Sequence, residues 1–285
     1  MTAVRIDGNQ VAATILAEVA EGIEARVAAG LPRPHLAALL VGDDPASETY
    51  IRLKHRDAEK VGMTSSDHRL PATATTAAVV ELVESLNRDD EVSGVLVQTP
   101  LPPGVDAAVA LAAVDPVKDV DGLHPINAGR LLLGEPGMLP NTPAGVIRML
   151  DHYGIEIAGR RAVMLGRSNI VGKPTAVLLL RRNATVTICH SKTVGLADIC
   201  REAEILVVAI RQLDFVTPDM VRPGAVVVDV GVNTRPGGGR LGGDVAPAVA
   251  EVAGWLSPVP GGVGPVTRAM LMANTWQAEQ ARRPG

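Results

Sequence analysis

Residues 161–174 read RAVMLGRSNIVGKP, and this stretch does most to decide the fold. The apolar run Ala162–Leu165 predicts a buried strand, and the loop that opens at Gly166 leads into a helix with Pro174 near its start. Such a unit turns backbone N–H groups and a helix N-terminus toward a pyrophosphate. The spacing is not G-x-G-x-x-G, because Ser168 takes the second glycine position. The motif alone therefore leaves a dinucleotide site and an ordinary connection equally open.

The next predicted strand, Thr185–Cys189, bears on the choice of cofactor. In an NAD-selective site, an acidic residue about 20 positions after the first glycine binds the ribose 2′-hydroxyl. Here the strand leads to Ser191 and Lys192 without a carboxylate, and Arg167 lies in the loop itself. A guanidinium binds a 2′-phosphate that a carboxylate would repel. A dinucleotide bound here is therefore predicted to be NADP, with Arg167 and Ser191 as the best candidates to contact its phosphate.

Strand and helix patterns alternate along the rest of the chain. Asp44 is suited to cap a helix that begins at Pro45 and ends before Gly62. This rhythm predicts an α/β fold of two α/β domains flanking a cleft, the second a Rossmann-like parallel sheet. Further strands are expected at 36–41, before Pro71, and at 92–97, 205–209 and 225–230, and further helices at 76–87, 105–113, 142–153 and 267–280.

The length of 285 residues favours two domains. We place the first at 1–140, completed by a C-terminal helix at 267–285, and the second at 141–266. Hydrophobic residues make up 47% of the chain and aromatic residues only 2%. The core is therefore expected to be aliphatic, as in buried parallel strands.

Charge and cysteine content narrow the choice of partners. The net charge of −4 provides no basic footprint and argues against nucleic acid as the main partner. No apolar run in the sequence reaches membrane-spanning length, and the N-terminus lacks an apolar signal core. Cys189 and Cys200 lie in apolar contexts and are expected to be buried free thiols. We expect a cytoplasmic protein with no membrane partner and no metal site.

Polar residues of the first domain gather where predicted strands end. Tyr50 and Lys54 are four residues apart and share one face of a predicted helix. Gln98 ends the strand at 92–97, and Asp121 follows in a turn-forming segment. Each has an ordinary alternative, since Lys54 could be a solvated lysine, Gln98 a strand-end hydrogen bond and Asp121 a turn residue. Their common place at the carboxyl ends of strands is what links them.

Six stretches, in order along the chain, resemble the methylenetetrahydrofolate dehydrogenase/cyclohydrolase family. They cover nearly the whole chain and are highly specific as a set, although the loop at 166–174 alone would not be. The stretches are 41–50 (VGDDPASETY) continuing to Lys54, 94–102 (GVLVQTPLP), 118–125 (KDVDGLHP), 142–145 (TPAG), 166–174 (GRSNIVGKP) and 258–265 (PVPGGVGP).

The resemblance implies two consecutive reactions. NADP⁺ takes a hydride from the methylene bridge of 5,10-methylenetetrahydrofolate, and water then opens the resulting methenyl cation to 10-formyltetrahydrofolate in the same cleft. It further implies a folate substrate as the small-molecule partner, a place in one-carbon metabolism and purine biosynthesis, and a homodimer that pairs through the nucleotide domains. A methenyl cation is already electrophilic, so the hydrolytic step needs no metal and no covalent nucleophile.

The resemblance also implies roles for single residues. Lys54 is the expected catalytic lysine of the hydrolytic step, and a lysine can take a proton from water only if its pKa is lowered. Gln98 is expected to hydrogen-bond and tune Lys54, and Asp121 to hold the donor edge of the pterin. Tyr50 is expected to stack on the folate ring system. The other implied residues are Pro260, Gly261 and Gly264 for the substrate, and Gly166, Arg167, Ser168, Ser191, Val232 and Thr142 for the cofactor.

Three departures from the family pattern stand out, one of which is Thr99, in place of the usual apolar residue after Gln98. Asn141 takes a position where a Cys is common, which is expected to matter little. Residues 209–214 replace the usual Val-Gly-x-Pro-like turn, whose Gly allows close approach of the cofactor, and bring Arg211 and Gln212 into it. This turn is the least family-like part of the predicted nucleotide site.

Two alternatives compete with the family interpretation. One is another two-domain NADP-dependent oxidoreductase of the shikimate-dehydrogenase type, which would not need Tyr50, Gln98 and Asp121 together. The other is a non-enzymatic nucleotide-binding regulator, which would not need Lys54.

Overall fold

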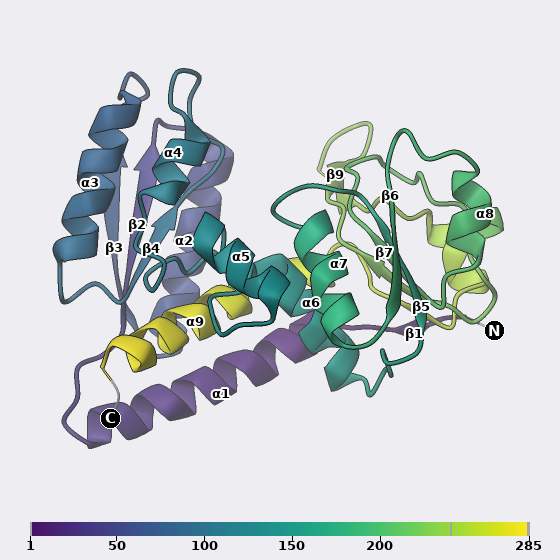
Figure 1. Cartoon of the computed structure of the whole chain (residues 1–285), viewed down its shortest axis with the longest axis horizontal. Coiled ribbons are helices and arrows are strands. Elements are labelled where there is room, and N and C mark those ends of the chain that lie inside the picture. The colour runs from purple at the N-terminus through teal and green to yellow at the C-terminus, as the bar shows by residue number, and fades with distance from the viewer. Residues whose placement is uncertain (1, 240, 284–285) are drawn as a thin grey trace. The chain divides into compact units, whose positions relative to one another are not determined.

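The chain forms two compact units (Figure 1). The computed structural model describes residues 2–239 and 241–283, so residues 284 and 285 of the expected C-terminal segment lie outside the described residues. The six-stranded unit comprises Met1–Ala12 and Thr142–Thr267. The three-stranded unit comprises Ala13–Asn141 and Arg268–Gly285.

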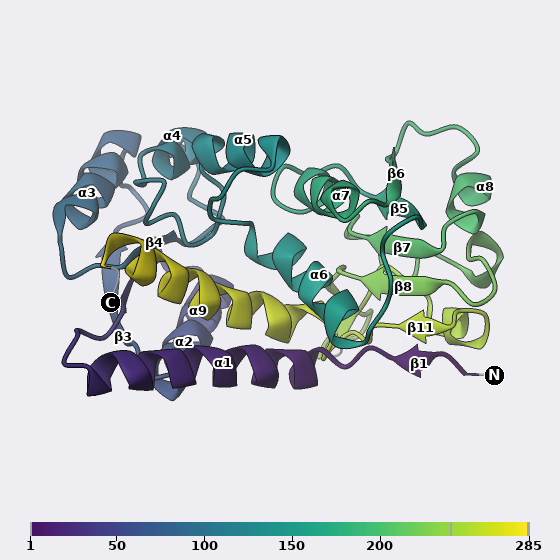
Figure 2. The same ribbon diagram turned by 60° about the horizontal axis from the view of Figure 1, so that its bottom comes forward.

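Parallel strands build the large sheet of the six-stranded unit. They are β1 (Val4–Arg5), β5 (Arg161–Leu165), β6 (Thr185–Cys189), β7 (Ile205–Val208), β8 (Val226–Asp229) and β11 (Trp255–Leu256). Their order is β1-β11-β8-β7-β5-β6, and Figure 2 shows β7, β8, β11 and β1 side by side. All five pairings are parallel, which confirms the predicted Rossmann-like sheet. Because β6 and β7 lie on opposite sides of β5, the strand order reverses at β5, where ligands of such sheets bind.

The N-terminal residues join this sheet. Val4 of β1 pairs with Trp255 of β11. We expected residues 1–140 in one domain, but residues 1–12 belong to the six-stranded unit because β1 extends its sheet. The remaining elements of the unit are the helices α6 (Asn141–His152), α7 (Gly172–Arg181) and α8 (Leu196–Arg201), the 3-10 turns η1 (Pro218–Met220) and η2 (Pro247–Glu251), and the antiparallel pair β9 (Asn233–Thr234) and β10 (Leu241–Gly242).

The cores of both units are aliphatic, as the composition predicts. Strand residues such as Val163, Leu206 and Val227 meet in the six-stranded unit, and Cys189 and Cys200 are free thiols buried among them. The core of the three-stranded unit includes Leu39 and Val95 from its strands and Val83 from a helix. In the described part of the chain, no helix is both long and apolar enough to cross a membrane.

The three-stranded unit has a parallel sheet in the order β3-β2-β4. Its strands are β2 (His35–Val41), β3 (Thr64–Leu70) and β4 (Gly94–Val97). Its helices are α2 (Pro45–Lys60), α3 (Thr76–Arg88), α4 (Ala107–Ala112) and α5 (Pro125–Leu133), together with most of α1 (Gly8–Ala28) and of α9 (Val263–Arg282). A buried ion pair ties α1 to α9, since Nη2 of Arg26 lies 2.6 Å from Oε1 of Glu279.

The predicted start of α2 is confirmed. Asp44 is its N-cap, and its carboxylate accepts a hydrogen bond from the N–H of Ser47 at 2.8 Å, while Pro45 opens the helix. The helix ends at Lys60, and Gly62 follows with a φ of 80°. This start places the helix that carries Lys54 directly after the carboxyl end of β2.

Candidate active site

Lys54 and Gln98 are in direct contact in the three-stranded unit. Lys54 lies on α2, and Gln98 is the first residue after β4. Nζ of Lys54 donates a hydrogen bond to Oε1 of Gln98 at 2.9 Å. The Gln98 amide is fixed in turn, because its Nε2 donates to the carbonyl of Thr99 at 2.7 Å and the residue is only 8% exposed. The two carboxyl-end residues singled out in the sequence therefore form one cluster.

The segment around Asp121 is drawn against β4 by backbone pairing. The N–H of Val95 donates to the carbonyl of Lys118 at 2.8 Å, and Val95 forms a parallel bridge with Asp119. A Cβ at Gly94 would lie 2.2 Å from Cγ1 of Val120, so only glycine allows this approach. Asp121 is thus carried to the same end of the sheet as Gln98.

Lys54 and Asp121 shift each other's pKa. Burial lowers the pKa of Lys54, and the negative charge of Asp121 opposes that shift. Burial raises the pKa of Asp121, whereas Lys54 and a hydrogen bond from Asn141 lower it and the nearby Asp119 raises it. Burial thus favours the neutral forms of both groups, and their mutual attraction favours the charged ones.

Asn141 contributes more to this cluster than the sequence suggested. Its Nδ2 donates to Oδ1 of Asp121 at 2.9 Å, and its own Oδ1 accepts a hydrogen bond from Nδ2 of Asn274 at 2.9 Å. We expected the exchange of Cys for Asn here to matter little, but the amide supplies a donor that directly contacts Asp121. Sequence patterns do not identify Asn274, because this residue of α9 belongs to no recognisable motif.

Asp119 and Tyr50 have different surroundings. The carboxylate of Asp119 accepts hydrogen bonds from the N–H groups of Leu123 and His124 and from Nδ2 of Asn127, so it holds its own loop. Tyr50 lies one helical turn before Lys54 and is 50% exposed. Its exposed ring is available to a ligand, and its stacking role stays a prediction.

The loop after β5 in the six-stranded unit is shaped by two glycines. Gly166 has a φ of 128°, and a Cβ there would lie 2.4 Å from the carbonyl oxygen of Ala209. A Cβ at Gly172 would lie 2.4 Å from the carbonyl oxygen of Gly166. The hydroxyl of Ser168 accepts hydrogen bonds from the N–H groups of Val171 and Gly172, at 3.2 Å each. The loop is thus closely wound onto the N-terminus of α7.

The other predicted cofactor residues follow the carboxyl ends of three strands of the same sheet. Arg167 comes after β5 and Ser191 after β6, and both are exposed. Val232 comes after β8 and is 49% exposed. Close winding at Gly166, an exposed guanidinium and an exposed hydroxyl fit a dinucleotide phosphate. The contacts of Arg167, Ser191 and Val232 with the cofactor stay predictions.

The remaining predicted residues also belong to the six-stranded unit. The hydroxyl of Thr142 hydrogen-bonds to that of Thr267 at 2.9 Å. Pro260 follows a cis peptide bond, Gly261 has a φ of 95°, and Gly264 lies in the first turn of α9. Their contacts with substrate or cofactor stay predictions.

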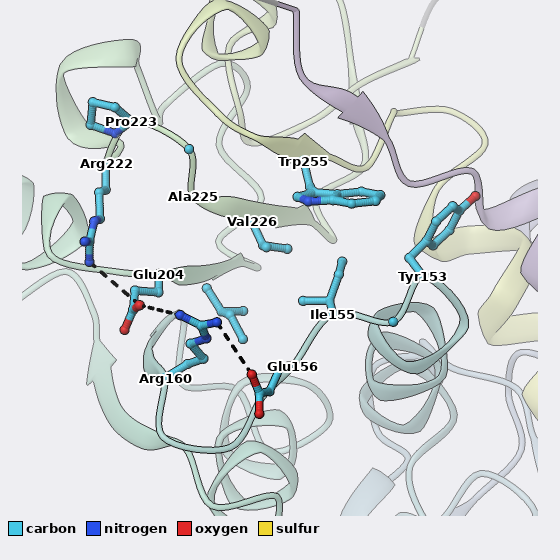
Figure 3. Close-up of a pocket in the computed structure, with 13 residues that line it drawn as sticks. Tyr153, Ile155, Glu156, Arg160, Glu204, Arg222, Pro223, Ala225, Val226 and Trp255 are labelled. Atoms are coloured by element: carbon cyan, nitrogen blue, oxygen red, sulfur yellow. Dashed lines mark hydrogen bonds and ion pairs between the residues drawn. The ribbon is translucent and has the colours of Figure 1, made fainter.

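A pocket of about 340 Å³ lies elsewhere in the six-stranded unit, where β7, β8 and β11 begin. Figure 3 shows the rings of Tyr153 and Trp255 on one side of it and the charged side chains on the other. These charges neutralise one another, since Arg160 lies 3.0 Å from Glu204 and 3.7 Å from Glu156. The pocket is at the opposite ends of the strands from the Gly166 loop, and none of the predicted site residues lines it.

Two family models match the chain. Residues 6–121 match the tetrahydrofolate dehydrogenase/cyclohydrolase catalytic domain, and residues 140–283 match the NAD(P)-binding domain of the same family. The chain therefore belongs to the tetrahydrofolate dehydrogenase/cyclohydrolase family. This membership supports the bifunctional enzyme over the shikimate-type alternative and over a non-enzymatic regulator.

Relatives and solved structures agree with this assignment. The chain is 48% identical to the bifunctional protein FolD of Ruminiclostridium cellulolyticum, over 98% of both chains, and 52% identical to FolD 1 of Rubrobacter xylanophilus, over 97% of both. The FolD structure from Campylobacter jejuni superposes with a TM-score of 0.96 at 41% identity, covering 98% of this chain and 99% of that one. The Trypanosoma brucei dehydrogenase-cyclohydrolase, solved with NADP and an inhibitor, has a TM-score of 0.93 at 39% identity and covers 99% of both chains.

Proposed function

We propose that Lys54 is the catalytic group of the hydrolytic step, and the hydrogen bond that it donates to Gln98 is the observation that carries this proposal. The chain is a bifunctional enzyme that oxidises 5,10-methylenetetrahydrofolate to the methenyl form and hydrolyses that to 10-formyltetrahydrofolate. The hydrolytic step needs a group that takes a proton from the attacking water. Burial lowers the pKa of Lys54 and so enlarges the fraction of neutral amine, whose lone pair accepts that proton.

Gln98 positions the amine of Lys54, and Asp121 binds the substrate and shifts the pKa of Lys54. The Gln98 carbonyl oxygen fixes the position of Nζ by accepting its hydrogen bond. Asp121 offers a carboxylate that accepts hydrogen bonds from the N–H groups of the pterin, and its charge sets how readily Lys54 loses a proton. Tyr50 supports substrate binding, because an exposed aromatic ring stacks well on a flat heterocycle.

NADP is the cofactor, and when bound it accepts the hydride from the methylene group. The backbone at Gly166, together with Ser168, would hold the pyrophosphate against the N-terminus of α7. Arg167 and Ser191 would bind the 2′-phosphate. The NADP complex of the Trypanosoma brucei relative supports this choice of nucleotide.

Other assignments rest on the resemblance to the family. Val232 and Thr142 are proposed to contact the cofactor, and Pro260, Gly261 and Gly264 the folate. We assign the three-stranded unit to folate binding and catalysis, and the six-stranded unit to NADP binding. The product 10-formyltetrahydrofolate is a one-carbon donor, which supports a role in purine biosynthesis.

A homodimer in the cytoplasm completes the proposal. Buried free thiols at Cys189 and Cys200 support a reducing compartment. β6 ends the six-stranded sheet, and Thr187 and Ile188 on it are exposed, with Ile188 at 44%. A sheet edge of this kind can pair with a second copy of the chain. Sedimentation equilibrium tests this proposal, and a monomer at micromolar concentration would contradict it.

The role of Lys54 is tested by Lys54→Met, which removes the amine and keeps an unbranched apolar stem. Hydrolysis of supplied methenyltetrahydrofolate should fall by orders of magnitude, while NADP binding survives. Lys60→Met is the matched control, because Lys60 is an exposed lysine on the same helix. Unchanged hydrolysis in Lys54→Met, or equal losses in both variants, would refute the assignment.

A further inference from the structure

Two buried carboxylates lie beneath the loops that follow β7 and β8. Asp229 is the last residue of β8, and Asp244 comes two residues after β10. Asp229 is 3% exposed and Asp244 is completely buried. Burying a carboxylate is costly unless its oxygens are hydrogen-bonded, so their partners show what the two residues do.

The carboxylate of Asp244 accepts four hydrogen bonds from two loops. The N–H groups of Ile210 and Arg211 donate to Oδ2 at 2.7 and 3.0 Å. The N–H of Gln212 and Nδ2 of Asn233 donate to Oδ1 at 2.8 and 2.9 Å. Three consecutive backbone N–H groups thus converge on one side chain, and this side chain ties the turn after β7 to the loop after β8.

Asp229 supports the backbone that carries Asp244. Its Oδ1 accepts hydrogen bonds from the N–H groups of Gly231 and Asp244, and its Oδ2 accepts one from the N–H of Val245, all at 3.0 Å. Burial raises the pKa of Asp229 to about 7, although these three N–H groups favour the charged form. Asp229 therefore fixes the backbone at Asp244 and Val245, and Asp244 in turn fixes the two loops.

Two glycines make this arrangement sterically feasible. A Cβ at Gly231 would lie 2.1 Å from Cγ of Asp244, and a Cβ at Gly243 would lie 1.7 Å from Oδ2 of Asp229. Real Cβ atoms do not come so close to other heavy atoms, so the backbone wraps the carboxylates more tightly than any larger residue permits. The path of both loops is set by the carboxylates within them.

The turn held by Asp244 lies directly against the nucleotide loop. Ala209, which precedes the turn, has its carbonyl oxygen 2.4 Å from the position that a Cβ on Gly166 would take. Arg211 has a φ of 56°, a left-handed conformation that residues with a Cβ rarely adopt. The backbone N–H groups that donate to Asp244 come from Arg211 and from both its neighbours. These hydrogen bonds stabilise a left-handed conformation that the glycine usual in this turn of the family would adopt more easily.

We propose that Asp244 is a positioning residue for NADP, which fixes the backbone of the turn after β7 and of the loop after β8 beside Gly166. Its carboxylate holds the backbone of Arg211 in one conformation by accepting hydrogen bonds from the N–H groups of residues 210–212. Asp244 does not touch the reacting atoms, and its effect is on cofactor affinity.

The two activities of the enzyme provide the test. Asp244→Asn keeps the size of the side chain, but its amide NH₂ confronts N–H donors. The KM for NADP⁺ should rise about tenfold or more, as expected for lost charge-assisted hydrogen bonds. Hydrolysis of supplied methenyltetrahydrofolate, which needs no NADP, should be unchanged and shows that the variant is folded. Asp198→Asn, whose side chain is 77% exposed on α8, should change neither.

A second variant covers the case in which Asp244→Asn does not fold. Asn233→Ala removes one of the four donors and keeps the carboxylate, so the KM for NADP⁺ should rise by a smaller factor at unchanged hydrolysis. An unchanged KM in the folded variants overturns the proposal. A parallel loss of both activities in folded Asn233→Ala also overturns it, because that would reduce the Asp244 hydrogen bonds to a general structural role.

Discussion

Side-chain contacts organise the cluster around Lys54, whereas backbone geometry organises the nucleotide loops. In the three-stranded unit, Lys54 donates a hydrogen bond to Gln98, and the charges of Lys54 and Asp121 shift each other's pKa. In the six-stranded unit, the expected phosphate ligands Arg167 and Ser191 are exposed. The backbone of the surrounding loops is fixed by close packing at glycines and by hydrogen bonds to buried carboxylates.

The difference follows from what each region has to do. A lysine acts as a base near neutral pH only when its pKa is lowered, and the side chains around Lys54 do this by partly desolvating its amine. A phosphate is bound by accessible cations and backbone N–H groups, so its ligands stay open while the chain beneath them is fixed. Changes in the first region should alter rates and pH dependence, and changes in the second should alter cofactor affinity.

The largest effect after the loss of Lys54 is expected from the phosphate ligands. Replacing Arg167 and Ser191 together by Ala should raise the KM for NADP⁺ by about tenfold or more, because charge-assisted hydrogen bonds to the 2′-phosphate are lost. The KM for NAD⁺ should barely change. Steady-state dehydrogenase kinetics with both nucleotides measure this, with Arg181→Ala on the exposed end of α7 as control. Equal effects on both nucleotides would mean that the 2′-phosphate is bound elsewhere.

A smaller effect, on pH dependence, is expected at Asn141. Asn141→Ala removes a hydrogen bond that lowers the pKa of Asp121, so that pKa should rise further. Activity that needs the carboxylate is lost as the pH falls through this pKa, and the acid limb of the rate profile should therefore move to higher pH. Rate profiles of the wild type and the variant measure the shift. An acid limb that stays in place, or moves to lower pH, would remove Asn141 from the cluster.

The smallest effect is expected at Arg211 and concerns stability. Arg211→Gly relieves the left-handed backbone at a φ of 56°, and after the entropic cost of glycine it should stabilise the fold by about 0.5–1 kcal/mol. Gln212→Gly is the matched control next to it, where no positive φ is relieved and glycine should destabilise by a similar amount. Thermal denaturation measures both. Destabilisation by both substitutions would show that Arg211 is not strained.

Local patterns predict the elements whose signals lie within a few residues. Asp44 and Pro45 predict the start of α2, and the apolar run before Gly166 predicts β5. The expected helices do not include α5, because proline and glycine within a short segment are also typical of loops. In the structure Pro125 occupies the first helical turn, and Gly134 caps the end with a φ of 80°.

Contacts between distant segments could not be predicted in this way. Asn141 and Asn274 are 133 residues apart and meet only once α9 packs in the three-stranded unit. The function of Asp244 depends on which backbone N–H groups turn inward at residues 210–212, and no sequence pattern encodes that. The helix α1 and strand β1 were also not predicted, and β1 has only two residues, whose partner strand lies about 250 positions later.

The most direct test of Lys54 is a single progress curve. Methylenetetrahydrofolate and NADP⁺ are mixed with the wild type or with Lys54→Met, and the absorbance of methenyltetrahydrofolate is followed through formation and decay. The wild type should show a transient, whereas in Lys54→Met the methenyl compound should accumulate and decay no faster than in buffer. Decay in Lys54→Met at the wild-type rate would contradict the central claim that Lys54 carries the hydrolytic step.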